Sequence, residues 1–160
     1  YSGESGGLNE STSDIFGTAV EFYAGNSADP GDYLIGEKIM IGGKGYLRNM
    51  MDPTLDGGSI DHYSKYKNGI DVHYSSGIAN NFFYLLSEGG KNRTSGKTVT
   101  GISRAKAEKI WYRALTVYMT SSTNFKAART ATLSAAKDLY GATGAEYAAV
   151  GNAWTAVGVN

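Results

Sequence analysis

The chain has no cysteine among its 160 residues, and this absence narrows the chemistry that it can carry. No disulfide can brace the fold and no thiolate can bind a metal, so a metal site must use histidine or carboxylate ligands. No apolar run approaches the roughly 20 residues that span a bilayer. Fifteen basic residues balance fifteen acidic ones, so no long-range field attracts nucleic acid or an anionic membrane. We expect neither nucleic acid nor a membrane as a partner.

Glycine is abundant instead, with 22 residues, or roughly twice its usual frequency of about 7%. The glycines gather between Gly25 and Gly101, which indicates long shaped loops of the kind that carry function or bind ions. The length and the 41% hydrophobic content fit one domain covering residues 1–160. Because no charged and then apolar leader opens the chain, we expect a soluble protein that is already processed or cut from something longer.

Apolar residues at three- and four-residue spacing predict a set of helices. The expected helices cover residues 8–23, 78–86, 103–119, 124–140 and 143–157. In them, Val20, Tyr23 and Leu139 are expected to face the core. Ser103 is expected to begin the third helix as its N-cap.

Thr143 and Glu146 have the spacing of a capping box at the start of the last helix. Between the helices, residues 33–41 are expected to be irregular or weakly β, residues 42–68 a long loop with short helical turns, and residues 91–101 a polar loop. We therefore expect a mainly α, bundle-like domain of about five helices with a long glycine-rich loop.

Two carboxylates near the start of the chain are the first candidates for a site. Glu10 and Asp14 are four residues apart, so a helix places them on the same face. Such a pair could supply a metal ligand and a group that orients a neighbouring ligand. It could equally be the solvated acidic edge of a helix, and these residues alone leave both interpretations open.

Three motifs, taken in order, carry a resemblance to a known family. They are residues 5–17 (SGGLNESTSDIFG), residues 46–53 (YLRNMMDP), and residues 61–64 (DHYS) with 68–78 (NGIDVHYSSGI). The chain resembles the C-terminal half of the thermolysin-family zinc metallopeptidases, the bacterial neutral proteases, over essentially all of its length. The resemblance implies the helical fold of the thermolysin C-terminal domain and places the protein among secreted, extracellular enzymes.

One departure from the family pattern bears on activity. The His-Glu-x-x-His helix, which in the family supplies two zinc ligands and the general base, is absent, and the chain begins just after the place where it would stand. The resemblance therefore implies that this chain supplies one of three zinc ligands and shares Zn²⁺ with an N-terminal half. We expect the chain to be inactive without that partner.

The resemblance assigns roles to the catalytic residues. Glu10 is the third zinc ligand, and Asp14 is its neighbour that accepts a hydrogen bond from a zinc-bound histidine. His73 stabilises the oxyanion, and Tyr1 hydrogen-bonds the same developing charge. The carboxylate that orients this histidine in thermolysin is replaced here by Asn68, and Asp71 is the expected substitute. Without the resemblance, His73 would be interpreted as a packed or surface residue and Asp71 as a solvated loop acid.

The resemblance also assigns a substrate pocket. Arg48 matches the arginine that binds a substrate backbone carbonyl; by itself it would be an ordinary surface arginine. The residues that match the pocket for the side chain after the scissile bond are Ile35, Gly36, Ile39 and Leu47. An apolar pocket there implies cleavage before Leu, Phe or similar residues. Without the resemblance, these residues would be assigned to the core.

Calcium is the second expected ion. The carboxylates of Glu21, Asp32 and Glu37 match the principal calcium site of the family, together with a backbone carbonyl near Leu34. The position of a further family calcium ligand is occupied by Gly45, which removes that ligand. Three other loop carboxylates are expected to cap turns and not to bind metal. They are Asp52, Asp56 and Asp61.

Two hypotheses from different functional classes follow. In the first, the chain is the C-terminal half of a secreted zinc endopeptidase, and the partners are the N-terminal half and a peptide or protein substrate. In the second, it is a separate binding module that presents half of a cleft to a protein inhibitor, a propeptide or a substrate protein. A degenerate, purely structural homologue is a weaker third option, since Glu10, Asp14 and His73 are all intact.

Overall fold

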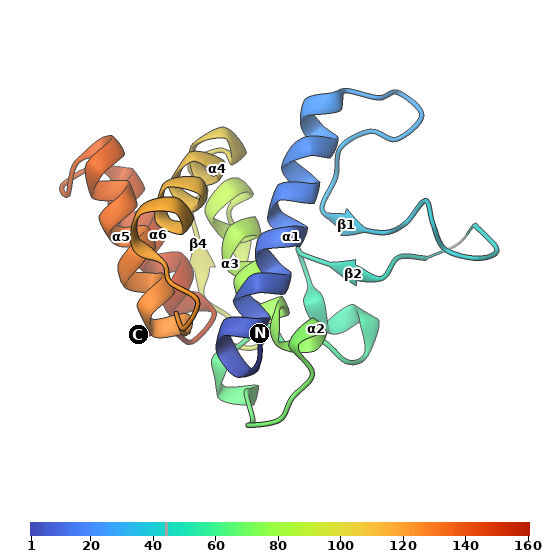
Figure 1. Ribbon diagram of the computed structural model, residues 1–160. Helices are drawn as coiled ribbons and strands as arrows, with labels where there is room; N and C mark the ends of the chain where they lie inside the picture. The colour runs from blue at the N-terminus through green and yellow to red at the C-terminus, as the bar shows by residue number, and fades with distance from the viewer. Residues whose placement is uncertain (44) are drawn as a thin grey trace.

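The computed structural model describes residues 1–43 and 45–160, and most of its regular structure is helical (Figure 1). The α-helices are α1 (Gly3–Ala24), α2 (Val72–Ser75), α3 (Gly77–Glu88), α4 (Arg104–Arg113), α5 (Phe125–Tyr140) and α6 (Ala145–Ala156). Shorter turns are η1 (Pro53–Asp56), η2 (Tyr63–Lys65) and the π-helical η3 (Ala114–Tyr118). Apart from the single turn α2, these are the five helices expected, so the mainly α fold is confirmed.

Two short antiparallel strand pairs complete the secondary structure. They are β1 (Leu34–Ile35) with β2 (Arg48–Asn49), and β3 (Gly90–Lys91) with β4 (Thr98–Val99). The first pair lies within the segment expected to be irregular or weakly β and the long loop after it. The second pair makes a hairpin of the segment that the sequence predicted as a plain polar loop, because its backbone groups pair with each other across the turn.

The core is built around α3, which Figure 1 shows between α1 on one side and the packed pair of α5 and α6 on the other. Phe82 of α3 is fully buried, stacks on Trp154 of α6 with 4.0 Å between ring centroids, and lies 6.1 Å from Trp111 of α4. Small residues on α5 and α6, such as Ala128 and Ala153, let these helices approach closely. The buried centre therefore joins α3, α4 and α6, and α1 closes one side of it.

The buried face of α1 differs from the predicted one. Tyr23 is 91% exposed, and Val20 is also exposed, so their placement in the core was wrong. Besides two glycines, the buried residues of the helix are Leu8, Ser11, Asp14, Ile15 and Thr18, and the half-buried Phe22 continues this face. Because three of the five buried side chains are polar, an apolar pattern could not show which face of the helix is buried. Phe22 meets the ring of Tyr33 and the guanidinium of Arg104.

Four further details of the helix ends differ from expectation. The capping box is wrong, since α6 begins after Gly144 without a side-chain cap and Glu146 pairs with Lys106 at 2.6 Å. Ser103 precedes α4 as predicted, but with φ of 83° and no side-chain cap. Leu139 is exposed, because the last turn of α5 borders an open hollow. The helix predicted to reach residue 119 changes at Ala114 into the π-helical turn η3.

A carboxylate near the start of the chain fixes α1 against α5. Glu4 accepts hydrogen bonds from the Phe125 backbone N–H and from the Tyr63 hydroxyl, each at 2.8 Å. The first of these satisfies a free amide at the N-terminus of α5, where a negative charge is also favoured by the helix dipole. The Asn124 side chain caps the same helix by accepting from Ala127 N–H.

Of the three loop carboxylates predicted to cap turns, Asp52 and Asp56 accept from their own turns, whereas Asp61 binds Lys65 and the distant Thr94. Asp52 caps η1 by accepting from Thr54 N–H, and Asp56 accepts from Gly58 N–H in the turn that follows. Asp61 is only 1% exposed and accepts from Lys65 and from both the hydroxyl and the N–H of Thr94. Burial alone would raise the pKa of Asp61, but these hydrogen bonds outweigh it and hold the pKa below its usual range.

Candidate metal and substrate site

Three of the predicted site residues converge on the solvent side of α1. The Tyr1 hydroxyl donates to Oε1 of Glu10, and Nε2 of His73 lies 3.5 Å from Oε2 of the same carboxylate. The hydrogen bond to Glu10 raises the pKa of Tyr1. Residues separated by 72 positions in sequence thus meet at one carboxylate, and all three side chains remain accessible to a ligand.

Asp71 positions His73, as expected from the sequence. Its Oδ1 accepts from the His73 backbone N–H at 2.9 Å, which makes it the N-cap of α2, and lies 2.7 Å from the ring Nδ1. These hydrogen bonds from His73 lower the pKa of Asp71. The Asp71 carboxylate therefore fixes the positions of both the backbone N–H and the ring of His73. The ring nitrogen Nε2 is left directed at Glu10.

Two glycines in α1 let α2 approach closely enough for this contact. A Cβ added at Gly6 would lie 2.6 Å from a methyl carbon of Val72, and one added at Gly7 would lie 2.5 Å from the Ser75 hydroxyl. Any larger residue would push the two helices apart. The distance between Glu10 and His73 therefore depends on glycine one turn before the carboxylate.

Asp14 is held by a network that sequence reasoning did not find. It is 5% exposed, and Arg48 grips it with two hydrogen bonds, from Nε at 2.8 Å and from Nη2 at 2.9 Å. Asn80 of α3 donates to Oδ2 at 2.8 Å and in turn accepts from Ser11 at 2.7 Å. The predicted metal-site carboxylate and the predicted substrate-binding arginine are thus one buried ion pair.

The charges around Arg48 keep its guanidinium ionised. The hydrogen bonds that Arg48 donates to Asp14 raise the pKa of Arg48 further above its usual value, against the effect of burial, and the negative charges of Glu10 and Asp56 act in the same direction. Asp14 binds only one edge of the Arg48 guanidinium, through Nε and Nη2, so its other N–H groups stay available to an oxygen acceptor.

The residues of the predicted apolar pocket come together around β1 and β2. Ile35 is the register partner of Arg48, and its carbonyl accepts from Leu47 N–H at 2.7 Å. Gly36 has φ of 82°, and a Cβ there would lie 2.8 Å from Leu47 and 3.5 Å from Ile39. The four residues are therefore neighbours, with Leu47 and Ile39 exposed and Ile35 packed against the core.

The predicted calcium residues also come together. One carboxylate oxygen from each of Glu21, Asp32 and Glu37 lies within 4.8 Å of the others. Glu21 accepts from Asp32 N–H at 2.8 Å, and Asp32 accepts from Leu34 N–H at 2.7 Å, so the turn itself aims these side chains. Burial raises the pKa of Glu21, the hydrogen bond from Asp32 opposes it, and the neighbouring charges of Glu37 and Asp32 add to the rise. Clustered oxygen ligands of this kind fit Ca²⁺.

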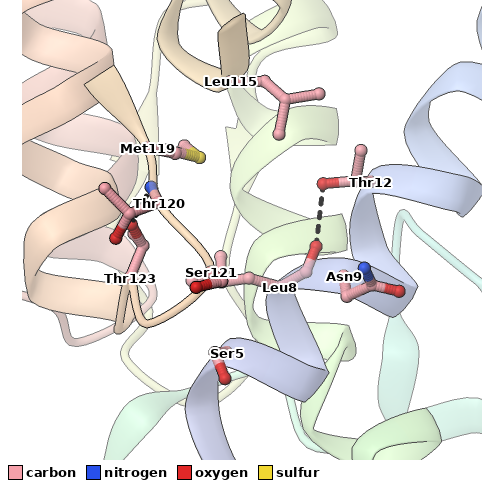
Figure 2. A pocket seen from close by; sticks show the side chains of 9 residues that line it. All are labelled: Ser5, Leu8, Asn9, Thr12, Leu115, Met119, Thr120, Ser121 and Thr123. Carbon is pink, nitrogen blue, oxygen red and sulfur yellow. Dashed lines mark hydrogen bonds between the residues drawn. The ribbon is translucent and has the colours of Figure 1, made fainter. Parts of the chain in front are cut away.

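A different hollow lies between the first turns of α1 and the segment after η3 (Figure 2). Leu8, Leu115 and Met119 form its apolar part, and hydroxyl side chains surround it. Thr12 turns its hydroxyl to the Leu8 carbonyl at 2.8 Å. Because no charged side chain lines this hollow, it offers no acid, base or cationic group for chemistry.

Comparison with known proteins identifies the family. The sequence model described as the thermolysin metallopeptidase, alpha-helical domain, matches residues 1–159. The chain belongs to this family. The resemblance seen in the three motifs is therefore confirmed, and membership in a family of metallopeptidases implies zinc.

Relatives of this thermolysin-family domain include much longer proteins. A transglutaminase-activating metalloprotease of Streptomyces mobaraensis is 54% identical over 99% of this chain and 22% of its own length. A bacillolysin of Bacillus cereus is 51% identical over 100% of this chain and 28% of its own. The structure of a precursor of protealysin, a metalloproteinase from Serratia proteamaculans, is also similar. The similarity covers 100% of this chain and 51% of the protealysin precursor chain, with 30% identity and a TM-score of 0.75. The domain thus spans only about a quarter of the length of the first two relatives and about half of the protealysin precursor chain.

The carboxylate of Glu10 on α1 has the chemistry of a zinc ligand in this thermolysin-family domain. Glu10 offers an accessible carboxylate, and the polar groups beside it come from Tyr1 and His73. Asp14 lies one helical turn away on the same face and is already oriented by Arg48.

In the part of the chain that the structure describes, no helix is both long and apolar enough to cross a membrane.

Proposed function

We propose that residues 1–160 act as one domain, the C-terminal half of a secreted zinc endopeptidase that cleaves peptide bonds before apolar residues. The observation that carries this proposal is the convergence of Tyr1 and His73 on Glu10, beside an arginine held by Asp14. The protein names of the relatives, metalloprotease and bacillolysin, support the same class of reaction.

In this proposal Glu10 supplies one zinc ligand, and an N-terminal half with the His-Glu-x-x-His helix supplies two more. Bound zinc would polarise the scissile carbonyl and lower the pKa of a bound water. Asp14 accepts a hydrogen bond from a zinc-bound histidine with the lone pairs that Arg48 and Asn80 leave free. The domain alone, with a single ligand, would not hold zinc tightly or hydrolyse peptides.

The residues of this chain then act on the substrate. Asp71 orients the His73 ring so that Nε2 faces the space beside Glu10, where an oxyanion would develop, and the Tyr1 hydroxyl lies on the same side. The free N–H groups of Arg48 would donate to a substrate backbone carbonyl. Leu47, together with its neighbours in the predicted apolar pocket, would contact the side chain after the scissile bond.

A reconstitution experiment tests the function. Residues 1–160 are produced together with the His-Glu-x-x-His half of a relative, and cleavage of a peptide with Leu after the scissile bond is followed with and without a zinc chelator. We expect chelator-sensitive cleavage that requires both halves. A Glu10→Gln variant, similar in size but a poorer ligand, should lose zinc and activity together. Two folded halves without activity, but with a complex formed with a propeptide or protein inhibitor, would instead favour the binding module.

We also propose that Glu21, Asp32, Glu37 and the Leu34 backbone carbonyl bind Ca²⁺. Calcium at about 100 times its Kd should raise the free energy of unfolding by about 2.7 kcal/mol, measured as a shift in thermal midpoint. Glu37→Gln should abolish the shift. Asp29→Asn is the matched control, because Asp29 lies in the same turn and pairs with Lys38 outside the cluster. An undiminished shift in Glu37→Gln would contradict the site.

The pH dependence of the cluster provides a second readout. The pKa of Glu21 is raised in the fold, so its contribution to stability is present at low pH and is lost as pH rises through that pKa. Without calcium, the thermal midpoint of Glu21→Gln should therefore fall less than that of the parent as pH rises through this region. With calcium, the thermal midpoint of the parent should fall less than that of Glu21→Gln, because the parent has the better ligand set.

A further inference from the structure

A hollow of about 280 Å³ lies beside the proposed reaction centre. Its lining residues are Leu47 and Arg48 at β2, Asp56 at the end of η1, and His73 and Tyr74 of α2. Leu47 and Tyr74 are exposed and apolar in their greater part, and they form the walls. The Tyr74 ring lies against the backbone of Gly58, where an added Cβ would be 2.5 Å from the ring. The loop after η1 is thus shaped to make this hollow.

Asp56 is the one acidic side chain that lines the hollow. Its carboxylate accepts from Gly58 N–H at 2.8 Å, Ser59 N–H at 2.7 Å and the Ser59 hydroxyl at 2.5 Å. These three donors are neutral, so they hold the carboxylate in place without cancelling its charge. Among residues 1–43 and 45–160, no cationic side chain forms an ion pair with Asp56.

The neighbouring side chains of the hollow direct their hydrogen bonds to other carboxylates. Arg48 feels the charge of Asp56, but its two hydrogen bonds go to Asp14. His73 lies between Asp71 at 2.7 Å and Glu10 at 3.5 Å. The hollow therefore combines apolar walls with one fixed negative charge that forms no ion pair, and this environment suits a long side chain with an apolar stem and a cationic head.

We propose that Asp56 is a specificity-determining residue, which selects a lysine or arginine side chain of the substrate at a position close to the scissile bond. The aliphatic stem would pack on Leu47 and Tyr74, and the ammonium or guanidinium would reach the carboxylate. This inference rests on the proposed peptidase function, and it adds a charged preference to the apolar pocket formed around Gly36.

The test compares cleavage of a positional-scanning peptide library by the full peptidase that carries this domain and by its Asp56→Asn variant. We expect the parent to prefer Lys over norleucine by about fivefold in kcat/KM at one position, the size of an accessible ion pair. Asp56→Asn should remove that preference and leave the cleavage of norleucine peptides unchanged. Raised ionic strength should weaken the preference in the parent, because the pair is accessible to solvent.

Two further variants separate charge from structure. The asparagine amide can still accept from Gly58 and Ser59, so the turn should survive, and Asp56→Glu should keep part of the Lys preference. Asp138→Asn is the matched control, since it also removes a surface carboxylate that accepts from a hydroxyl, but on α5 outside the hollow. An active parent whose preferences are identical in Asp56→Asn overturns the inference and leaves the peptidase function standing. A parent without peptidase activity overturns both.

Discussion

Replacing His73 with alanine is expected to lower kcat of the reconstituted peptidase by about 10²–10³, the usual effect of losing one oxyanion donor. KM should change little, because the ring meets charge that develops only in the transition state. Nε2 of His73 lies 3.5 Å from Glu10, the carboxylate proposed to bind zinc, whereas the proposed contact with the bound substrate belongs to Arg48, which is held by Asp14. Steady-state kinetics with one peptide substrate measures both parameters.

The second histidine provides the control. His62 caps η2, bonds to Ser64 and packs on Gly158, so it lies away from Glu10. His62→Ala should leave kcat of the folded protein unchanged. The kcat of Asp71→Asn should lie between those of His73→Ala and His62→Ala, since Asn retains a hydrogen bond to the ring but removes the charge. A His73→Ala enzyme with undiminished kcat would remove this residue from the proposed mechanism.

Much of the site could be predicted because its residues lie in short contiguous motifs. Asp71 and His73 are two positions apart, so capping brings the carboxylate to the His73 backbone N–H. Helical periodicity places Glu10 and Asp14 on one face, but the roles proposed for all four residues came from the family resemblance. The five long helices followed from apolar spacing for the same reason, since each is a local pattern that tertiary packing reinforces.

What could not be predicted depends on polar residues that are buried for a partner far away in sequence. Asn80 and Asn81 lie in a helix whose other residues are largely apolar, and both are buried because they bond across the fold, to Asp14 and to the Met50 and Met51 carbonyls. Their presence in such a helix is the signal that could have marked a network. The partner could not be read from spacing, because 66 residues separate Asn80 from Asp14.

The same network makes the loss of Arg48 strongly destabilising. Asp14 is 5% exposed, so Arg48→Met leaves a buried carboxylate with only Asn80 as donor. Removing one partner of such a pair typically costs about 3–5 kcal/mol, which for a chain of this size lowers the thermal midpoint by roughly 10 °C. Arg48→Lys should recover only part of this loss, because an ammonium cannot form the two-pronged contact.

Arg93→Met is the matched control for this loss. Arg93 bonds to Asp52 at 2.9 Å, much as Arg48 bonds to Asp14, but its side chain is 63% exposed. Its removal should cost less than about 1 kcal/mol. Thermal and urea unfolding of both variants measures the difference, and the double variant Asp14→Asn with Arg48→Met should recover much of the stability, since no buried charge is left unpaired. Equal losses for Arg48→Met and Arg93→Met would mean that burial of Asp14 has no energetic consequence, and the arginine would then serve the substrate alone.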